Sequence, residues 1–222
     1  MKKIRTGQEF LGWVVSGITP LVILMLTIRL LITPLFAWVQ YHMPGFPDDP
    51  YGFTLEDRLR YSEPSIRYLV NSEGIEYLAA LSFEHGEPIY NARELSHMVD
   101  VKMVVTGMRI GLAVGIVLLV FLSLVALKQG WRNNLINDFR RGAYLLLGFI
   151  TGILLLLVVN FNNLFSWFHK IFFESGTWLF YTSDTLIRLF PLRFWRDAFI
   201  AVGVISVVIA SGVIIGSKKL TE

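Results

Sequence analysis

The chain has 222 residues, of which 54% are hydrophobic and 17% charged, and its mean hydropathy is +0.57. This composition is too apolar for an ordinary soluble domain and is typical of an integral membrane protein. The net charge of +3 does not indicate a nucleic-acid partner, and the absence of cysteine excludes disulfides, thiolate metal sites and a cysteine nucleophile. No H-E-x-x-H, G-x-S-x-G, Walker or dinucleotide-binding motif occurs, which argues against a zinc protease, a serine hydrolase and an ATPase.

Four apolar segments are long enough to cross a hydrocarbon core of about 30 Å as helices, which takes about 20 residues each. They lie at about residues 10–39, 101–127, 142–165 and 197–216. The first follows a basic stretch, as in a signal peptide, but its length of about 30 residues exceeds the usual apolar core of about 7–15. We therefore predict an all-α membrane protein with four transmembrane helices and a small helical extracytoplasmic cap.

Lysine and arginine are densest in the segments that we place inside the cell. Nine fall in about 30 residues of short segments, whereas nine others spread over about 90 residues on the opposite side, and short loops dominate the positive-inside rule. The inside set is Lys2, Lys3, Arg5, Lys128, Arg132, Arg140, Arg141, Lys218 and Lys219. Both termini are therefore predicted to be cytoplasmic, and all four histidines extracytoplasmic.

This orientation divides the chain into seven segments. They are residues 1–40 (cytoplasmic N-terminus and first helix), 41–100 (extracytoplasmic cap), 101–127 (second helix), 128–141 (cytoplasmic loop), 142–165 (third helix), 166–196 (aromatic-rich extracytoplasmic loop) and 197–222 (fourth helix and cytoplasmic C-terminus). Any chemistry that uses histidine is then expected on the extracytoplasmic face.

The cap is expected to be helical although it begins with a proline-rich stretch at residues 43–50, which cannot continue a helix. Thr54 followed by Asp57 resembles a capping box and predicts a short helix. Ser62 followed by Pro64 predicts the start of a second one.

The end of the cap carries the first histidine of interest. Asn91 and Glu94 predict an N-cap and a helix that runs unbroken into the second span. Arg93, His97 and Asp100 then fall near one face of this helix. Acids three residues away on either side can orient the imidazole and favour its charged form, which suits proton transfer. A hydrated interfacial histidine among ordinary surface charges is the alternative interpretation.

The second outer segment is rich in phenylalanine around a single histidine, His169. If the third helix continues outward, this histidine shares a face with an amide and several aromatic rings. An aromatic belt at the membrane interface is the alternative, but such belts favour tryptophan and tyrosine. We expect the substrate site to be lined by Arg93, Glu94, Asp100, Asn162, Phe165, Phe172, Phe173 and Trp178.

The chain contains R-E-L-S-H-M-V-D-V-K at residues 93–102, F-H-K-I-F-F at 168–173, Trp178, L-I-R-L-F-P at 186–191 and Phe194. Together these stretches resemble the bacterial lipoprotein intramolecular transacylase family, Lit. The resemblance covers nearly the whole chain, and its specific part is the two histidine motifs with their spacing. It implies that His97 and His169 are catalytic.

The resemblance also implies a reaction. The sn-2 acyl chain of S-diacylglyceryl-cysteine moves to the α-amino group of the same N-terminal cysteine, which gives a lyso-form lipoprotein. Diacylated bacterial lipoproteins and membrane lipid are then the expected partners, and the bacterial cell membrane the expected location. We expect no cofactor and no metal ion. A metal site built on the two histidines is the alternative, since imidazole is a common ligand, but spacing marks no third ligand beside them.

In the implied reaction, the amine attacks the ester carbonyl of the same molecule and forms an eight-membered cyclic intermediate. Such a ring forms readily only in a folded substrate, and a tight aromatic pocket would favour that folding. One histidine would take a proton from the amine and the other would protonate the leaving oxygen, and the sequence does not say which. A phospholipid-dependent intermolecular acyltransferase, and a non-catalytic scaffold or transporter subunit, are the alternatives. The roles of five arginines stay open: Arg29, Arg109, Arg188, Arg193 and Arg196.

Overall fold

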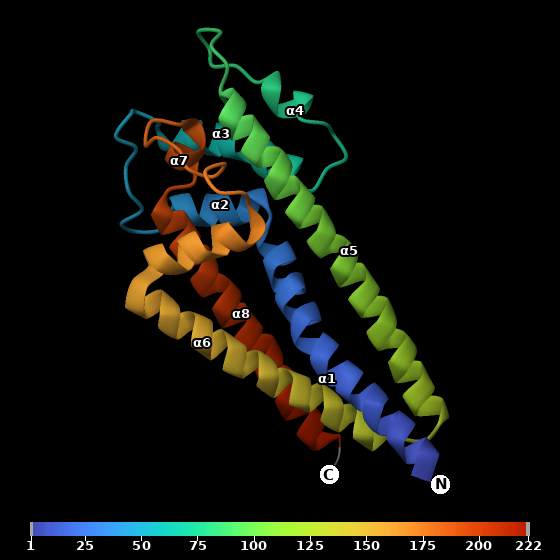
Figure 1. The fold of residues 1–222 in the computed structure, drawn as a ribbon. Helices are drawn as coiled ribbons and strands as arrows, with labels where there is room; N and C mark the ends of the chain where they lie inside the picture. Colours follow the sequence, from blue (N-terminus) through green and yellow to red (C-terminus); the bar gives the residue numbers. More distant parts are fainter. Residues whose placement is uncertain (1, 221–222) are drawn as a thin grey trace. The chain divides into compact units, whose positions relative to one another are not determined.

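The computed structural model describes residues 2–220, and their side chains from residue 7 onward. This part of the chain is almost entirely helical (Figure 1), with one isolated β-bridge between Ser82 and Pro88. The helices are α1 (Lys2–Leu31), α2 (Pro34–Tyr41), α3 (Leu55–Tyr68), α4 (Glu76–Ala79), α5 (Ala92–Lys128), α6 (Arg132–Phe172), α7 (Thr185–Leu189) and α8 (Leu192–Lys219). The predicted all-α class is confirmed.

Some of the predicted terminal segments fall outside what the structure describes. These are Met1, Thr221 and Glu222, together with the side chains of Lys2, Lys3 and Arg5, which contribute to the predicted orientation.

Within residues 2–220, four helices are long and apolar enough to cross a membrane: α1, α5, α6 and α8. At about 1.5 Å per residue, even the 28 residues of α8 exceed a hydrocarbon core of about 30 Å. The four predicted membrane-spanning helices are confirmed. α5, α6 and α8 extend beyond the predicted spans, and the membrane boundaries within them stay predictions.

The first apolar run is divided in the structure. α1 ends at Leu31, and α2 begins at Pro34 after Thr33, whose side chain accepts a hydrogen bond from the Phe36 N–H at 3.3 Å. Proline has no N–H to continue a helix, but it fits the first turn of a new one. The expectation of one uninterrupted helix over residues 10–39 is therefore wrong.

The chain forms two compact units. The bundle unit comprises Met1–Arg29, Met108–Val158 and Ile200–Glu222, and the cap unit comprises Leu30–Gly107 and Val159–Phe199.

Small residues let the helices of the bundle unit approach closely. A Cβ at Gly142 would lie 2.8 Å from the Ser16 carbonyl oxygen, and one at Gly115 would lie 2.6 Å from the Val22 side chain. Membrane helices pack in this way because lipid leaves no hydrophobic driving force between them. Large apolar side chains remain on the outside, such as Val158 at 81% exposure, as expected of a surface solvated by lipid.

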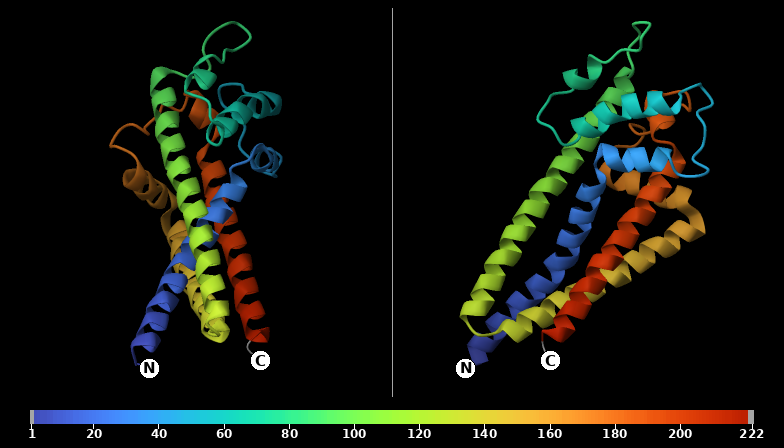
Figure 2. Two further views of the ribbon diagram at one scale, coloured as in Figure 1. Left: turned by 90° about the vertical axis from the view of Figure 1, so that its right-hand side faces the viewer. Right: turned by 180° about the vertical axis from the view of Figure 1, so that it is seen from behind.

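The cap unit has its own apolar core. Its most buried members are Tyr61, Tyr68, Leu78, Ile89, Tyr90, Met98, Leu186 and Leu189. Figure 2 shows α2 and α3 lying next to each other within this unit. Burial raises the pKa of Tyr41, at the end of α2, to about 12, so its hydroxyl stays protonated and donates to the Leu189 carbonyl oxygen at 2.9 Å. The predicted helical cap is therefore a folded structure in its own right.

α3 is a single helix where the sequence predicts two. The capping box of Thr54 and Asp57 forms as expected at its start. Pro64, which was expected to open a second helix, lies inside α3. The helix continues past Pro64 because its buried face packs into the cap core, and the Ser65 hydroxyl also bonds to the Tyr61 carbonyl oxygen at 3.3 Å.

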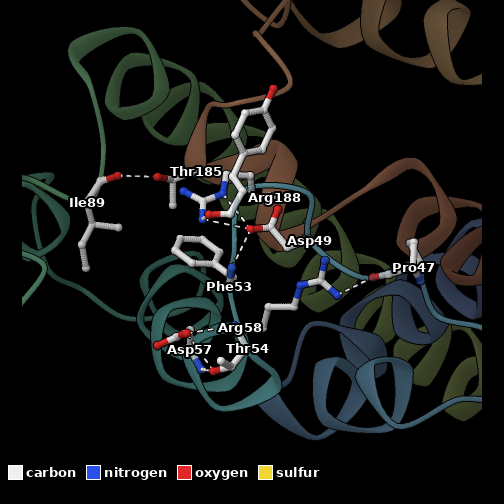
Figure 3. A network of polar contacts seen from close by, with 10 residues as sticks. Pro47, Asp49, Phe53, Thr54, Asp57, Arg58, Ile89, Thr185 and Arg188 are labelled. Atoms are coloured by element: carbon white, nitrogen blue, oxygen red, sulfur yellow. Dashed lines mark hydrogen bonds and ion pairs between the residues drawn. The ribbon is translucent and has the colours of Figure 1, made fainter.

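The proline-rich stretch at residues 43–50 is tied to the cap by arginines (Figure 3). Arg188 of α7 donates to Asp49 Oδ2 at 3.1 and 2.9 Å, and its guanidinium lies 3.4 Å from the centre of the Phe53 ring. Arg58 donates to the Pro47 carbonyl oxygen at 2.7 Å. Burial by itself would raise the pKa of Asp49, but hydrogen bonds from Arg188 and the Phe53 N–H outweigh it and lower the pKa.

A second arginine ties the same stretch to the start of α8. Arg193 donates to Asp197 at 2.7 Å and to the Gly45 carbonyl oxygen at 2.9 Å. Gly45 has φ +72°, which favours glycine at this turn. Arg196 also contacts Asp197, at 3.4 Å. Arg188 and Arg193, two of the arginines whose roles were open, thus tie segments of the cap unit together.

Candidate active site

His97 and His169, which are 72 positions apart in the sequence, lie side by side in the cap unit. Their ring centres are 6.3 Å apart and their ring planes are inclined by 21°. Each residue is 8% exposed. The spacing is too wide for a direct hydrogen bond between the rings, and it is wide enough for both to contact the reacting atoms of one substrate.

α5 presents His97 on its second turn, and the start of this helix is capped as predicted. The Asn91 side-chain oxygen accepts the Glu94 N–H at 3.1 Å, and Glu94 Oε2 accepts the Asn91 N–H at 2.8 Å. The other oxygen of Glu94 accepts the Leu186 N–H at 2.7 Å. The expectation that Glu94 orients His97 is therefore wrong, because both of its oxygens bind backbone N–H groups.

α6 presents His169 beyond an interruption of the helix. Asn160 has φ −163° and ψ 94°, and its side-chain oxygen accepts the Asn163 N–H at 3.0 Å. This is N-cap geometry, so Asn160 ends one stretch of helix and starts the next. Within the second stretch, His169 Nδ1–H donates to the Phe165 carbonyl oxygen at 2.8 Å. The third helix thus continues to His169, but it does not continue straight.

Aromatic rings surround the histidine pair. Around His169 the ring centres lie at 4.1 Å for Phe165, 4.8 Å for Trp178 and 5.6 Å for Phe173. The ring centre of Phe173 also lies 4.9 Å from that of His97. These three of the predicted lining residues are therefore at the site, and they make its walls apolar.

Phe180 completes the wall, with its ring centre 5.3 Å from that of His97. No pattern in the sequence indicates this residue, because it lies in a loop without periodicity. Its loop is held by Asp184, which accepts hydrogen bonds from Arg93 at 2.8 Å and from the Tyr181 N–H at 2.8 Å. The Arg93 guanidinium also lies 4.9 Å from the centre of the Tyr181 ring. Arg93, predicted to bind substrate, thus anchors the loop that covers the site.

The remaining predicted lining residues do not contact the histidine rings. Phe172 is 47% exposed and packs against Phe168, with ring centres 4.9 Å apart. Asn162 is exposed, and Asp100 is partly buried.

Two polar atoms at the site are buried without a hydrogen-bond partner among residues 2–220. They are Nδ1 of His97 and Nε1 of Trp178. In the same range, no group of three or more histidine, aspartate or glutamate side chains is arranged to hold a metal ion. The site thus places two imidazoles and one indole N–H in an apolar enclosure, and imidazoles can take up and release protons near neutral pH.

Fold and site together define a multi-pass helical membrane protein with a two-histidine site enclosed by aromatic rings. A family model described as "Lipoprotein intramolecular transacylase Lit" matches residues 13–195. The chain belongs to this family.

Individual proteins are similar to the chain over most of its length. The chain is 28% identical over 204 residues to an uncharacterized protein of Aquifex aeolicus (strain VF5), which covers 90% of this chain and 89% of that protein. The solved structure of the membrane integral lipoprotein intramolecular transacylase Lit from Bacillus cereus is similar with a TM-score of 0.76 at 21% identity, covering 97% of this chain and 94% of that one. A histidine-to-alanine variant of the same protein gives a TM-score of 0.76 at 18% identity, with coverage of 99% and 97%. At these identities the structures support the fold alone.

Proposed function

We propose that this protein moves the sn-2 acyl chain of an S-diacylglyceryl-cysteine lipoprotein to the α-amino group of the same cysteine, giving the lyso form. Membership of the Lit family supports a lipoprotein substrate. The observation that carries the reaction is the buried pair of imidazoles, His97 and His169, at 6.3 Å within aromatic walls.

The bonding of Nδ1 gives the two histidines different roles. Nδ1–H of His169 is held by the Phe165 carbonyl oxygen, so Nε2 of the neutral ring carries a lone pair and can act as a base. Nδ1 of His97 is buried without a partner among the described residues, and a proton there would be an unsatisfied donor. The neutral His97 therefore keeps its proton on Nε2, where it can donate a hydrogen bond.

These roles fit one proton transfer. The α-amino group, with an ordinary pKa of about 7.7–8.0, attacks as the free amine and passes a proton to Nε2 of His169 as the N–C bond forms. When the C–O bond to the glyceryl group breaks, its oxygen takes up the proton that His169 holds. Nε2–H of His97 donates to this leaving oxygen. The sum is one amide formed and one ester broken, with both histidines neutral again.

The aromatic walls supply the other part of the catalysis. Donor ester and acceptor amine already belong to one molecule, so the site need only fold the substrate into an eight-membered ring, which is a contribution of proximity and orientation. No acyl-enzyme is needed, in keeping with the lack of cysteine and of a serine-nucleophile motif. We place this site on the extracytoplasmic face of the bacterial cell membrane, with both termini in the cytoplasm.

The decisive experiment mixes two diacyl lipopeptides, one with isotopically heavy and one with light acyl chains, with the purified protein in detergent and no added phospholipid. Mass spectrometry should show a rearranged product in which each molecule keeps its own chains and its own mass. A mass gain of one acyl chain, or exchange of label between molecules, would replace this mechanism with a phospholipid-dependent or intermolecular acyltransferase. An unchanged substrate would favour a non-catalytic protein.

A further inference from the structure

The indole N–H of Trp178 is a buried hydrogen-bond donor without a partner among residues 2–220. An indole N–H can donate but not accept, and it does not titrate in the physiological range. A buried polar group that stays unpaired costs free energy, so nearly all such groups in proteins are bonded to something. This atom therefore marks a position where an acceptor is expected to bind.

The position lies at the candidate active site. The centre of the Trp178 ring is 4.8 Å from that of His169, and His169 is in turn 6.3 Å from His97. The indole stands on a turn in which the Thr177 N–H bonds to the Glu174 carbonyl oxygen at 3.3 Å, and Gly176 has φ +93°. The turn follows directly on α6, which carries His169, so the backbone fixes the indole beside the imidazole.

The proposed reaction needs a donor that neither histidine provides. When the amine attacks the ester carbonyl, the N–C bond forms and the π electrons of the carbonyl move to its oxygen. That oxygen is negatively charged until the C–O bond to the glyceryl group breaks and the carbonyl forms again. His169 is occupied with the proton of the amine, and His97 with the leaving oxygen. A fixed, non-titrating donor aimed at the developing charge stabilises such an intermediate without giving up its proton.

We propose that Trp178 Nε1–H donates a hydrogen bond to the carbonyl oxygen of the acyl group as it becomes the oxyanion of the tetrahedral intermediate. This role rests on the acyl transfer proposed above, and it makes Trp178 a catalytic residue rather than only a wall of the site.

Two replacements test the contribution of the N–H separately from that of the aromatic ring. Trp178→Phe keeps an aromatic side chain but removes the donor, and Trp178→3-benzothienylalanine, introduced by site-specific suppression, replaces the N–H with sulfur in a ring of nearly the same shape. Both should lower kcat for a diacyl lipopeptide about 10²-fold, as expected for the loss of one oxyanion donor. The KM should stay within about threefold, because the donor acts on the transition state rather than on the bound ester.

Trp131→Phe is the matched control. Trp131 has the other buried indole N–H without a partner in the described range, but it lies in the apolar cluster of the bundle unit with Val15 and Leu122. This variant should retain the kcat of the unaltered protein, which shows that losing a buried indole N–H does not by itself impair the enzyme.

The outcomes separate this inference from the proposed function. If the benzothienylalanine variant keeps the full kcat, or if KM rises while kcat is unchanged, the N–H is not an oxyanion donor, even where Trp178→Phe loses activity through poor packing. If the unaltered protein transfers no acyl chain, or transfers it between molecules, the proposed function itself fails and this role fails with it. A low kcat in both Trp178 variants, with the unaltered protein and Trp131→Phe active, supports the assignment.

Discussion

At the scale of single residues, His97 and His169 differ in the hydrogen bonding of one ring nitrogen. Nδ1 of His169 is held by a backbone carbonyl 2.8 Å away, whereas Nδ1 of His97 has no partner in the described part of the chain. Both residues are only 8% exposed, so each of them also fills space in the cap unit. Alanine at either position would leave a cavity, and glutamine is the better replacement because it retains more of the side-chain volume.

His97→Gln and His169→Gln should each lower the rate of acyl transfer by about 10²–10⁴-fold, the usual contribution of a positioned acid or base. The rate is measured in detergent with a diacyl lipopeptide, alongside the thermal stability of each variant. His42→Gln and His85→Gln are the controls, because both of these residues are exposed. Activity within about tenfold of normal in either site variant would contradict the paired scheme.

At the scale of secondary-structure elements, the interruption of α6 at Asn160 decides where His169 lies. The Asn160 side chain caps the second stretch of the helix through the Asn163 N–H. A hydrophobic run of this length predicts one straight helix. The asparagine cap at residue 160 is the local feature that opposes this prediction. The stretch of α6 that carries His169 therefore starts at a side-chain cap.

Asn160→Ala should destabilise the protein by about 1 kcal/mol through the loss of this cap. It should also lower activity, because the second stretch of α6, which carries His169, loses the cap at its start. Asn160→Ser is the control, since its hydroxyl can still accept the capping hydrogen bond. Thermal unfolding and lipopeptide turnover are compared for the two variants, and equal values for both would argue against the cap.

The arginine ties of the cap lead to a prediction about pH. The folded-state pKa of Asp49 is lowered, so its ion pair with Arg188 contributes stability above the ordinary aspartate pKa of about 3.9. This stability is lost as the pH falls through the lowered folded-state pKa. Asp49→Asn should cost about 3 kcal/mol at pH 7, because the side chain of Asp49 is 0% exposed and that of Arg188 only 13%, so a buried charge is left unpaired.

Thermal unfolding in detergent between pH 7 and pH 3 tests this prediction. The melting temperature of the unaltered protein should fall only near the acid end, and Asp49→Asn should start lower and depend less on pH. Glu63→Gln breaks an exposed pair with Arg67 and should change stability by less than about 1 kcal/mol. Equal melting temperatures for Asp49→Asn and the unaltered protein at pH 7 would mean that the tie is not needed.

At the scale of the whole molecule, the orientation in the membrane is predicted from the density of basic residues. Asn134 and Glu84 are both exposed and are predicted on opposite sides, the first cytoplasmic and the second extracytoplasmic. Because the chain has no cysteine, a single cysteine introduced at either position is the only thiol of the protein that a reagent can label.

An impermeant thiol reagent on intact cells should label Glu84→Cys and leave Asn134→Cys unlabelled until the cells are opened. Labelling of both after permeabilisation is the control for accessibility. The reverse pattern on intact cells would place the histidines in the cytoplasm, and it would overturn the proposed extracytoplasmic site.

Features that depend on local chemistry can be predicted from the amino-acid sequence alone. The length of the apolar segments predicts four membrane-spanning helices, because backbone N–H and C=O groups in lipid find hydrogen-bond partners only within the helix. Side-chain capping specified the starts of α3 and α5, because Thr54 and Asn91 bond within four residues of themselves. Both histidines were found from the residue types around them.

Features that depend on partners far apart in the sequence become visible in the folded protein. Glu94 bonds to Leu186, Asp49 to Arg188, and Phe180 packs on His97, each pairing across more than 80 positions of the chain. Pro64 remains inside a helix because burial in the cap core outweighs its local preference. Residue type and periodicity report on a few turns of chain at most, whereas these pairings depend on which segments pack together.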